Sequence, residues 1–214
     1  MTGQLPESAR GEGTAHVSAL WLDEFGRLTG HVLHGLRNGL QGVGINLEVI
    51  RSRSEVGSAT AADLRVFAAN AARQFEDVSA QVEALAFLSK DVPGDAEIDA
   101  TMRAIVTLLN AGGDTRVQLD GGAPQAKAAV SHIAARLIIT HVIMSAAKTG
   151  SAVSCALVSA RPVTAELRMT PAMTPVLDQE VLTVARALHI RIAANASAVT
   201  VTFPTTTSSD TVLV

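Results

Sequence analysis

Two long runs of apolar residues at helical spacing constrain this chain more than any other feature. The first run repeats every three or four positions and comprises Leu33, Leu36, Leu40, Val43, Leu47 and Ile50. The second run has the same spacing and comprises Leu64, Phe67, Ala71, Phe75, Val78, Val82, Leu85 and Leu88. Between them, Gly57 suits a helix C-terminus, and Thr60 with Asp63 resembles a capping box. The sequence therefore predicts two long antiparallel helices joined by a short turn.

A single helical hairpin covers only one side of each apolar run. Two hairpins related by a twofold axis close a four-helix bundle, which covers the rest. The composition favours such self-association, because 48% of the 214 residues are hydrophobic and only 17% are charged. We therefore expect a homodimer whose helical hairpin spans residues 14–91, with Thr14 capping the first helix.

The sequence changes character at Asp91-Val92-Pro93-Gly94-Asp95, where Pro beside Gly interrupts any helix. Beyond this break, amphipathic helices alternate with β-branched strands. The expected helices are 96–111, 124–148 and 175–188, and the expected strands are 115–120, 152–160, 164–169, 190–194 and 198–203. This order is typical of a two-layer α/β sandwich, here over residues 95–204. By composition, residues 1–13 are expected to be a disordered leader and 205–214 a flexible tail.

Composition also excludes several functions. A net charge of −3 and 3% aromatic residues argue against a nucleic-acid partner. No apolar run reaches the roughly 18 residues that a membrane span needs, so we expect no membrane contact. A single cysteine cannot form an internal disulfide or a cysteine-rich zinc site, which favours a cytoplasmic protein.

The candidate site lies on the first helix, in the segment His34-Gly-Leu-Arg-Asn-Gly-Leu-Gln41. His34, Arg37, Asn38 and Gln41 are spaced so that they share one face, beside the leucine run. An exposed neutral imidazole is a competent nucleophile near neutral pH. Arg37 can neutralise phosphoryl oxygens, and Asn38 can hydrogen-bond them or orient a water molecule. Arg37, Asn38 and Gln41 are thus candidates for phosphoryl stabilisation or partner binding around a nucleophilic His34.

This segment resembles the H-box of bacterial sensor histidine kinases. Their pattern is His, an acid, a Leu-like residue, a basic residue, Asn or Thr, a small residue or Pro, then Leu. The hairpin resembles their dimerisation and phosphoacceptor domain, and the α/β half resembles their ATP-binding domain. The resemblance covers roughly residues 15–204 and implies that His34 is the phosphoacceptor.

The sequence departs from the kinase pattern at several positions. Gly35 stands where the family places an acid that acts as general base. Ser145-Ala146-Ala147-Lys148 replaces the Asn-Ala-x-Lys pattern whose Asn holds magnesium. No glycine follows Gly150, so a glycine-rich ATP lid and the adenine motif Asp-x-Gly-x-Gly are absent from the sequence. We therefore expect no bound cofactor or metal ion and no ATP-dependent autokinase activity.

A phosphoacceptor hairpin without a nucleotide site is similar to the dimeric histidine phosphotransferases that look like degenerate kinases. The resemblance implies reversible phosphoryl exchange between His34 and the aspartate of response-regulator receiver domains in a bacterial two-component phosphorelay. The receiver would supply Mg²⁺ and the acyl phosphate, and a hybrid histidine kinase is a further expected partner. Two alternatives remain open: a non-catalytic pseudokinase scaffold that binds a regulator, and a phosphatase of phosphorylated receivers in which Asn38 orients water.

Other polar residues are expected to be structural. His31 lies near His34 but lacks Arg at +3 and Asn at +4, and His132 and His141 have no chelating spacing. Asp23 and Glu24 are expected on a solvated helix face.

The glycines of the first helix allow two interpretations. They either weaken and kink the helix, or Gly35, Gly39 and Gly42 remove bulk so that a partner can approach His34.

Overall fold

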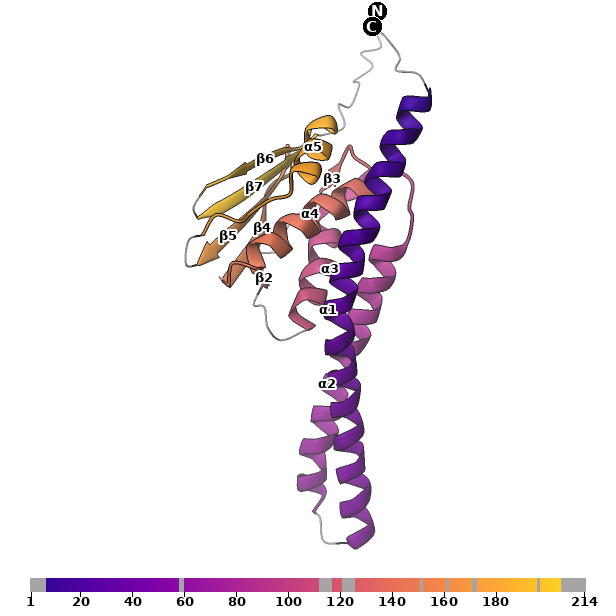
Figure 1. Cartoon of the computed structure of the whole chain (residues 1–214). Coiled ribbons are helices and arrows are strands. Elements are labelled where there is room, and N and C mark those ends of the chain that lie inside the picture. Colours follow the sequence, from indigo (N-terminus) through magenta and orange to yellow (C-terminus); the bar gives the residue numbers. More distant parts are fainter. Residues whose placement is uncertain are drawn as a thin grey trace, which may run out of the picture.

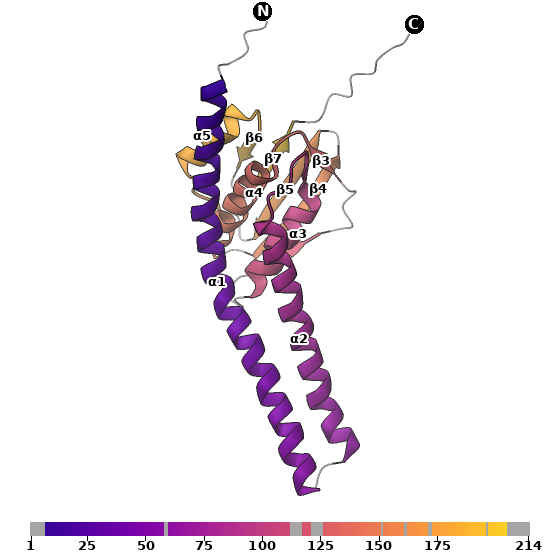
Figure 2. The same ribbon diagram turned by 90° about the vertical axis from the view of Figure 1, so that its right-hand side faces the viewer.

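Two long helices form the frame of the molecule. The structure, a computed structural model, describes residues 7–57, 60–111, 117–120, 126–150, 152–160, 162–170, 173–195 and 197–204. Helices α1 (Glu7–Val56) and α2 (Ala61–Ser89) form an antiparallel hairpin, and the α/β elements pack beside one end of it (Figure 1). The turn end of the hairpin extends beyond those elements (Figure 2).

The α/β elements follow the order expected from the sequence. Helices are α3 (Ile98–Ala111), α4 (His132–Ala147) and α5 (Gln179–Ala187). Strands are β1 (Ala96–Glu97), β2 (Val117–Leu119), β3 (Lys127–Ala128), β4 (Ala152–Ala160), β5 (Val163–Thr170), β6 (Arg191–Ala194) and β7 (Ala198–Phe203). β4 and β7 match the expected strands, whereas α4 begins at His132 rather than near 124. The preceding residues instead form β3, which pairs with β1 through Ala128 opposite Ala96.

A mixed sheet and a helical layer form the α/β part. The larger sheet has the order β2-β4-β5-β7-β6, with β2 parallel to β4 and every other pair antiparallel. Alternate residues of β5 and β7 are buried, so one face of this sheet packs inward. This arrangement confirms the predicted two layers.

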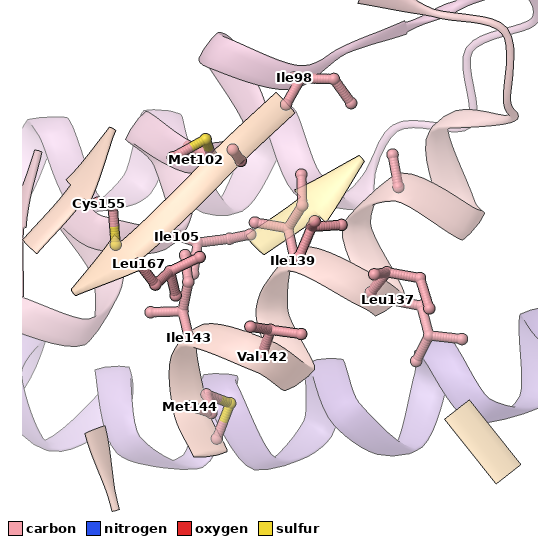
Figure 3. Close-up of a cluster of buried hydrophobic side chains, with 14 of the residues drawn as sticks. Ile98, Met102, Ile105, Leu137, Ile139, Val142, Ile143, Met144, Cys155 and Leu167 are labelled. Carbon is pink, nitrogen blue, oxygen red and sulfur yellow. The ribbon is translucent and has the colours of Figure 1, made fainter. Parts of the chain in front are cut away.

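The core lies between α3, α4 and the larger sheet (Figure 3). Ile105 of α3, Ile143 of α4 and Leu167 of β5 are fully buried there. Every residue of α4 except Ile133 is buried, so this helix lies at the centre of the packing. Cys155 of β4 belongs to this core, and burial raises the pKa of its thiol to about 12.

The hairpin and the α/β part share this core. The same buried cluster includes Trp21, Leu28 and Val32 from α1 and Leu88 from α2. The hairpin end near residues 21–32 therefore has α/β elements packed on it. This packing also explains why α1 begins at Glu7 and not at Thr14: a helix extends from a packed segment at little cost, so residues 7–13 of the expected disordered leader are helical. Residues 1–6 and the expected tail, 205–214, lie outside the described residues.

The turn between α1 and α2 forms as predicted. Gly57 has a φ of +67°, in the left-handed region that favours glycine at a helix end. The Thr60 hydroxyl accepts a hydrogen bond from the Asp63 amide at 3.3 Å, and the Asp63 carboxylate accepts one from the Thr60 amide at 3.1 Å. These reciprocal bonds confirm the capping box at the start of α2.

Three of the six residues in the apolar run of α1 and two of the eight in the run of α2 are exposed. On α1, Leu33, Leu40 and Leu47 are each 55–58% exposed, and on α2, Phe75 and Val82 are 60% and 52% exposed. These five residues, called the apolar stripe below, leave an uncovered surface on the hairpin. None of the helices in the described part of the chain is long and apolar enough to cross a membrane.

Candidate functional site

The four residues predicted to form the site all reach solvent. His34, Arg37, Asn38 and Gln41 are exposed along two turns of α1. None of them forms a hydrogen bond or an ion pair with another residue in the described ranges. The imidazole of His34 is therefore accessible to an incoming group, with Arg37 and Asn38 one turn further along the helix.

The C-terminal end of α3 packs against α1 at His31 and Gly35, the positions on either side of His34 along the helix. The Nε2 atom of His31 is 3.3 Å from the carbonyl oxygen of Leu109, which joins α1 to the last turn of α3. One turn along α1, a Cβ atom at Gly35 would lie 2.6 Å from the carbonyl carbon of Ala111 and closer still to its oxygen. Only glycine fits this contact without displacement of the backbone, so Gly35 is where α3 approaches α1.

The other two glycines of the segment also serve contacts within the chain. A Cβ atom at Gly39 would lie 2.6 Å from Cγ2 of Val78, and one at Gly42 would lie 2.5 Å from the Gln74 amide, both on α2. The interpretation that Gly35, Gly39 and Gly42 make room for a partner stays a prediction, but within the chain these glycines have a function of their own. They allow α2 and α3 to approach α1 closely, and α1 continues through them as an unbroken helix.

A cleft of about 550 Å³ opens where α1, α2 and α3 meet. It is lined by Gly35, Asn38 and Gly39 of α1, by Gln74, Asp77, Val78, Ala80 and Gln81 of α2, and by Thr107, Asn110 and Ala111 of α3. Of the four predicted site residues, only Asn38 lines it. The sequence gives no sign of this cleft, because its walls come from three helices that meet only in the folded chain.

Asn110 shapes the α3 wall of the cleft. Its Nδ2 donates to the Val117 carbonyl oxygen at 2.7 Å, and its Oδ1 accepts from the Val117 amide at 3.0 Å. This pair of bonds ties the end of α3 to strand β2. The wall beside His34 is therefore anchored to the sheet of the α/β part.

Arg136 of α4 connects the α/β part to the hairpin at the C-terminus of α2. This side chain is 1% exposed, and burial lowers its pKa. Its guanidinium donates to the carbonyl oxygens of Phe87 at 3.0 Å, Leu88 at 3.1 Å and Lys90 at 2.5 Å. Carbonyl groups at a helix C-terminus have no partner within the helix and attract positive charge. Arg136 thus caps α2 from α4, a role that sequence reasoning missed.

Glu24 is buried, contrary to the prediction of a solvated face. It is 4% exposed, with its Oε1 3.5 Å from Nδ1 of His141 and its Oε2 3.3 Å from Arg27. The Nε2 atom of His141 accepts a hydrogen bond from the Asp178 amide at 3.0 Å, so the ring proton lies on Nδ1, facing Glu24. Burial raises the pKa of Glu24, but the contact with His141 and the charges of Arg27 and Lys148 outweigh burial and lower it.

The spacing of the buried face of α1 could have revealed Glu24. Trp21, Glu24, Leu28, Val32 and Gly35 are all buried and recur every three or four residues. Asp23, by contrast, is exposed and bonds Arg27. His141 is structural, as predicted, because it links α1 to the start of α5.

The residues at positions that depart from the kinase pattern do not gather into a metal site within the described ranges. Ser145 is buried in α4, Lys148 is exposed just beyond that helix, and Glu166 of β5 is paired with Arg168. Within the described ranges, no three His, Cys, Asp or Glu residues gather closely enough to hold a metal ion.

Comparisons with known proteins give the following. No protein-family model matches the chain, and no curated protein matches it either. Among solved structures, the Erythrobacter litoralis EL346 blue-light activated histidine kinase is 13% identical, with a TM-score of 0.37, over 66% of this chain and 60% of that one. The Acinetobacter baumannii histidine kinase AdeS is 10% identical, with a TM-score of 0.37, over 81% of this chain and 98% of that one. The chain thus spans less than two thirds of the Erythrobacter kinase.

Proposed function

We propose that this protein is a histidine phosphotransferase that exchanges phosphoryl groups between His34 and the aspartate of response-regulator receiver domains in a two-component phosphorelay. The observation that carries the proposal is the exposed imidazole of His34, which has no bonding partner among the described residues, with Arg37 at +3 and Asn38 at +4 on α1. The receivers and a hybrid histidine kinase are the proposed partners, in the cytoplasm. Mg²⁺ is expected from the receiver.

The phosphoryl transfer requires from this chain a nucleophile and groups that stabilise the phosphoryl oxygens. A lone pair on an imidazole nitrogen of His34 attacks the phosphorus of the receiver's aspartyl phosphate. The new N–P bond forms as the O–P bond of the acyl phosphate breaks, and the aspartate leaves as a carboxylate. The proton on the other ring nitrogen then passes to water. Arg37 is placed to neutralise the phosphoryl oxygens, and Asn38 is placed to hydrogen-bond them.

We infer that the working form is a homodimer built on the apolar stripe. Leu33, Leu40 and Leu47 recur every seven residues, as do Phe75 and Val82, and this repeat matches coiled-coil packing. A second hairpin would cover the stripe and complete a four-helix bundle. Light scattering on the eluting protein should give twice the chain mass for the wild type and the single-chain mass for Leu40→Glu. A monomeric wild type would refute the inference.

Phosphate uptake tests the site. Incubation with phosphorylated receiver domains from the source genome should label the protein with an acid-labile, base-stable phosphate. His34→Ala should abolish the label, whereas His16→Ala, at another exposed histidine of α1, should retain it. Labelling that persists in His34→Ala would overturn the assignment.

Two alternative functions give different results in the same assay. A scaffold that binds receivers without accepting phosphate is favoured by Gly35, because the end of α3 fills the space that an acid would need. It would bind the receiver equally well with His34→Ala and take up no label. A receiver phosphatase is favoured by the place of Asn38 at the cleft. It would release phosphate to water, and Asn38→Ala would stop that release.

A further inference from the structure

The cleft between α1, α2 and α3 contains acceptor groups to which the described residues offer no donor. Gln81 is 8% exposed, and its Oε1 is buried without a hydrogen bond from any residue in the described part of the chain. Asp77 also lines the cleft, and its carboxylate forms no ion pair or hydrogen bond there. A buried acceptor without a donor is unfavourable, so Gln81 marks a place where a ligand can supply one. Gln81 lines the cleft, so its side chain lies next to the space that such a ligand would occupy.

The charge of the cleft selects the kind of ligand. Asp77 carries the single formal charge among the lining residues, and none of those described is Lys, Arg or His. Asn38 and Thr107 add further oxygen acceptors, whereas Oε1 of Gln74 already accepts a hydrogen bond from Nδ2 of Asn46 at 3.0 Å. A cation with several N–H donors complements this lining better than an anion or an apolar group. A guanidinium has five such donors in a planar arrangement and is less strongly hydrated than an ammonium group.

We propose that the cleft binds an arginine side chain presented by a docked protein partner. The volume of about 550 Å³ has ample room for one long side chain. Asn38 and Gly35 belong to both the cleft and the His34 segment, so an arginine bound there anchors its partner beside the phosphoacceptor. The identity of that partner as a receiver rests on the proposed function, whereas the cation site rests on the cleft alone.

The site is complete only when the α/β part is docked on the hairpin. One wall of the cleft belongs to α3 and consists of Thr107, Asn110 and Ala111. This wall is held against α1 by the contact between His31 and Leu109, and Gly35 leaves the space for its close approach. The experiment therefore uses the full chain.

A pair of matched probes tests the site without a known partner. Nα-acetyl-arginine amide is titrated into the ¹⁵N-labelled full chain and followed by nuclear magnetic resonance. Nα-acetyl-citrulline amide, which has nearly the same shape but no charge, is the matched probe. The side-chain amides of Asn38, Gln74 and Gln81 should shift and saturate with arginine, and citrulline should bind at least tenfold more weakly.

Matched variants test whether the carboxylate of Asp77 is the charge that binds arginine. Asp77→Asn should weaken arginine binding at least fivefold, whereas Glu76→Gln, at the neighbouring exposed acid of α2, should leave it unchanged. Gln81→Met, which keeps the volume and removes the amide, should also weaken it. Circular dichroism spectra like the wild type would show that these variants are folded.

Several outcomes would overturn the cleft proposal: no saturable shift with arginine, equal binding of citrulline, or an equal effect of Glu76→Gln and Asp77→Asn. The phosphotransferase proposal fails separately. A chain that takes up phosphate at His34 but binds no arginine refutes only the cleft site. A chain that binds arginine in the cleft but takes up no phosphate refutes only the transferase.

Discussion

Replacing Gly35 with alanine adds one methyl group where α3 meets α1. The new Cβ would lie 2.6 Å from the carbonyl carbon of Ala111 and 3.0 Å from its Cβ. The nearest atoms belong to backbone and not to a flexible side chain, so rotamer changes cannot relieve the overlap. The last turn of α3 has to move away from His34.

Two opposing effects set the size of the change. Alanine in place of glycine inside a helix stabilises by about 1 kcal/mol. Overpacking of a close contact costs about 1–3 kcal/mol. At Gly26, where nothing lies within 4 Å of the added Cβ, only the first effect operates. We therefore expect Gly26→Ala to stabilise the protein, and Gly35→Ala to be less stable than Gly26→Ala by about 1–3 kcal/mol.

Urea unfolding followed by circular dichroism measures both free energies. Amide hydrogen exchange locates the effect, because the last turn of α3 should exchange faster in Gly35→Ala and not in Gly26→Ala. Equal stabilisation by the two substitutions would refute the docking of α3 at Gly35. It would also remove the reason why an acid cannot be accommodated next to His34.

Two further predictions concern α4. Arg136→Met leaves three carbonyl oxygens at the end of α2 without their donor, so it should lower the free energy of unfolding in urea by about 2–4 kcal/mol; a loss below about 0.5 kcal/mol would contradict the capping role. Burial and the charge of Arg136 lower the pKa of His132 below 6.5, so the unfolded chain binds more protons between the two pKa values. The urea midpoint should therefore fall as the pH drops below about 6.5, and it should fall less in His132→Gln; an unchanged slope would exclude His132 as the cause.

Local signals in the sequence predicted much of the fold. The spacing of Leu36 and Val78 indicated the helices, Thr60 with Asp63 indicated the start of α2, and β7 has its predicted bounds. Helix starts were less predictable, since α1 gains residues 7–13 and α4 loses the segment before Ser131. The shift at α4 follows from the pairing of β3 with the distant strand β1, which local patterns do not encode. The extension of α1 is propagation from a segment packed on the α/β part.

The candidate site was likewise predictable only in part from the sequence. By itself, the sequence determined that His34, Arg37 and Asn38 share a face of one helix, because their spacing fixes that arrangement once a helix forms. Only the tertiary structure decided what surrounds this face. The contact of His31 with Leu109 joins residues 78 positions apart, and it places α3 beside the histidine. In the sequence, Gly35 is only a residue with low helix propensity. In the fold it is the point of close contact with Ala111, and the sequence around Gly35 does not reveal this contact because Ala111 lies far along the chain.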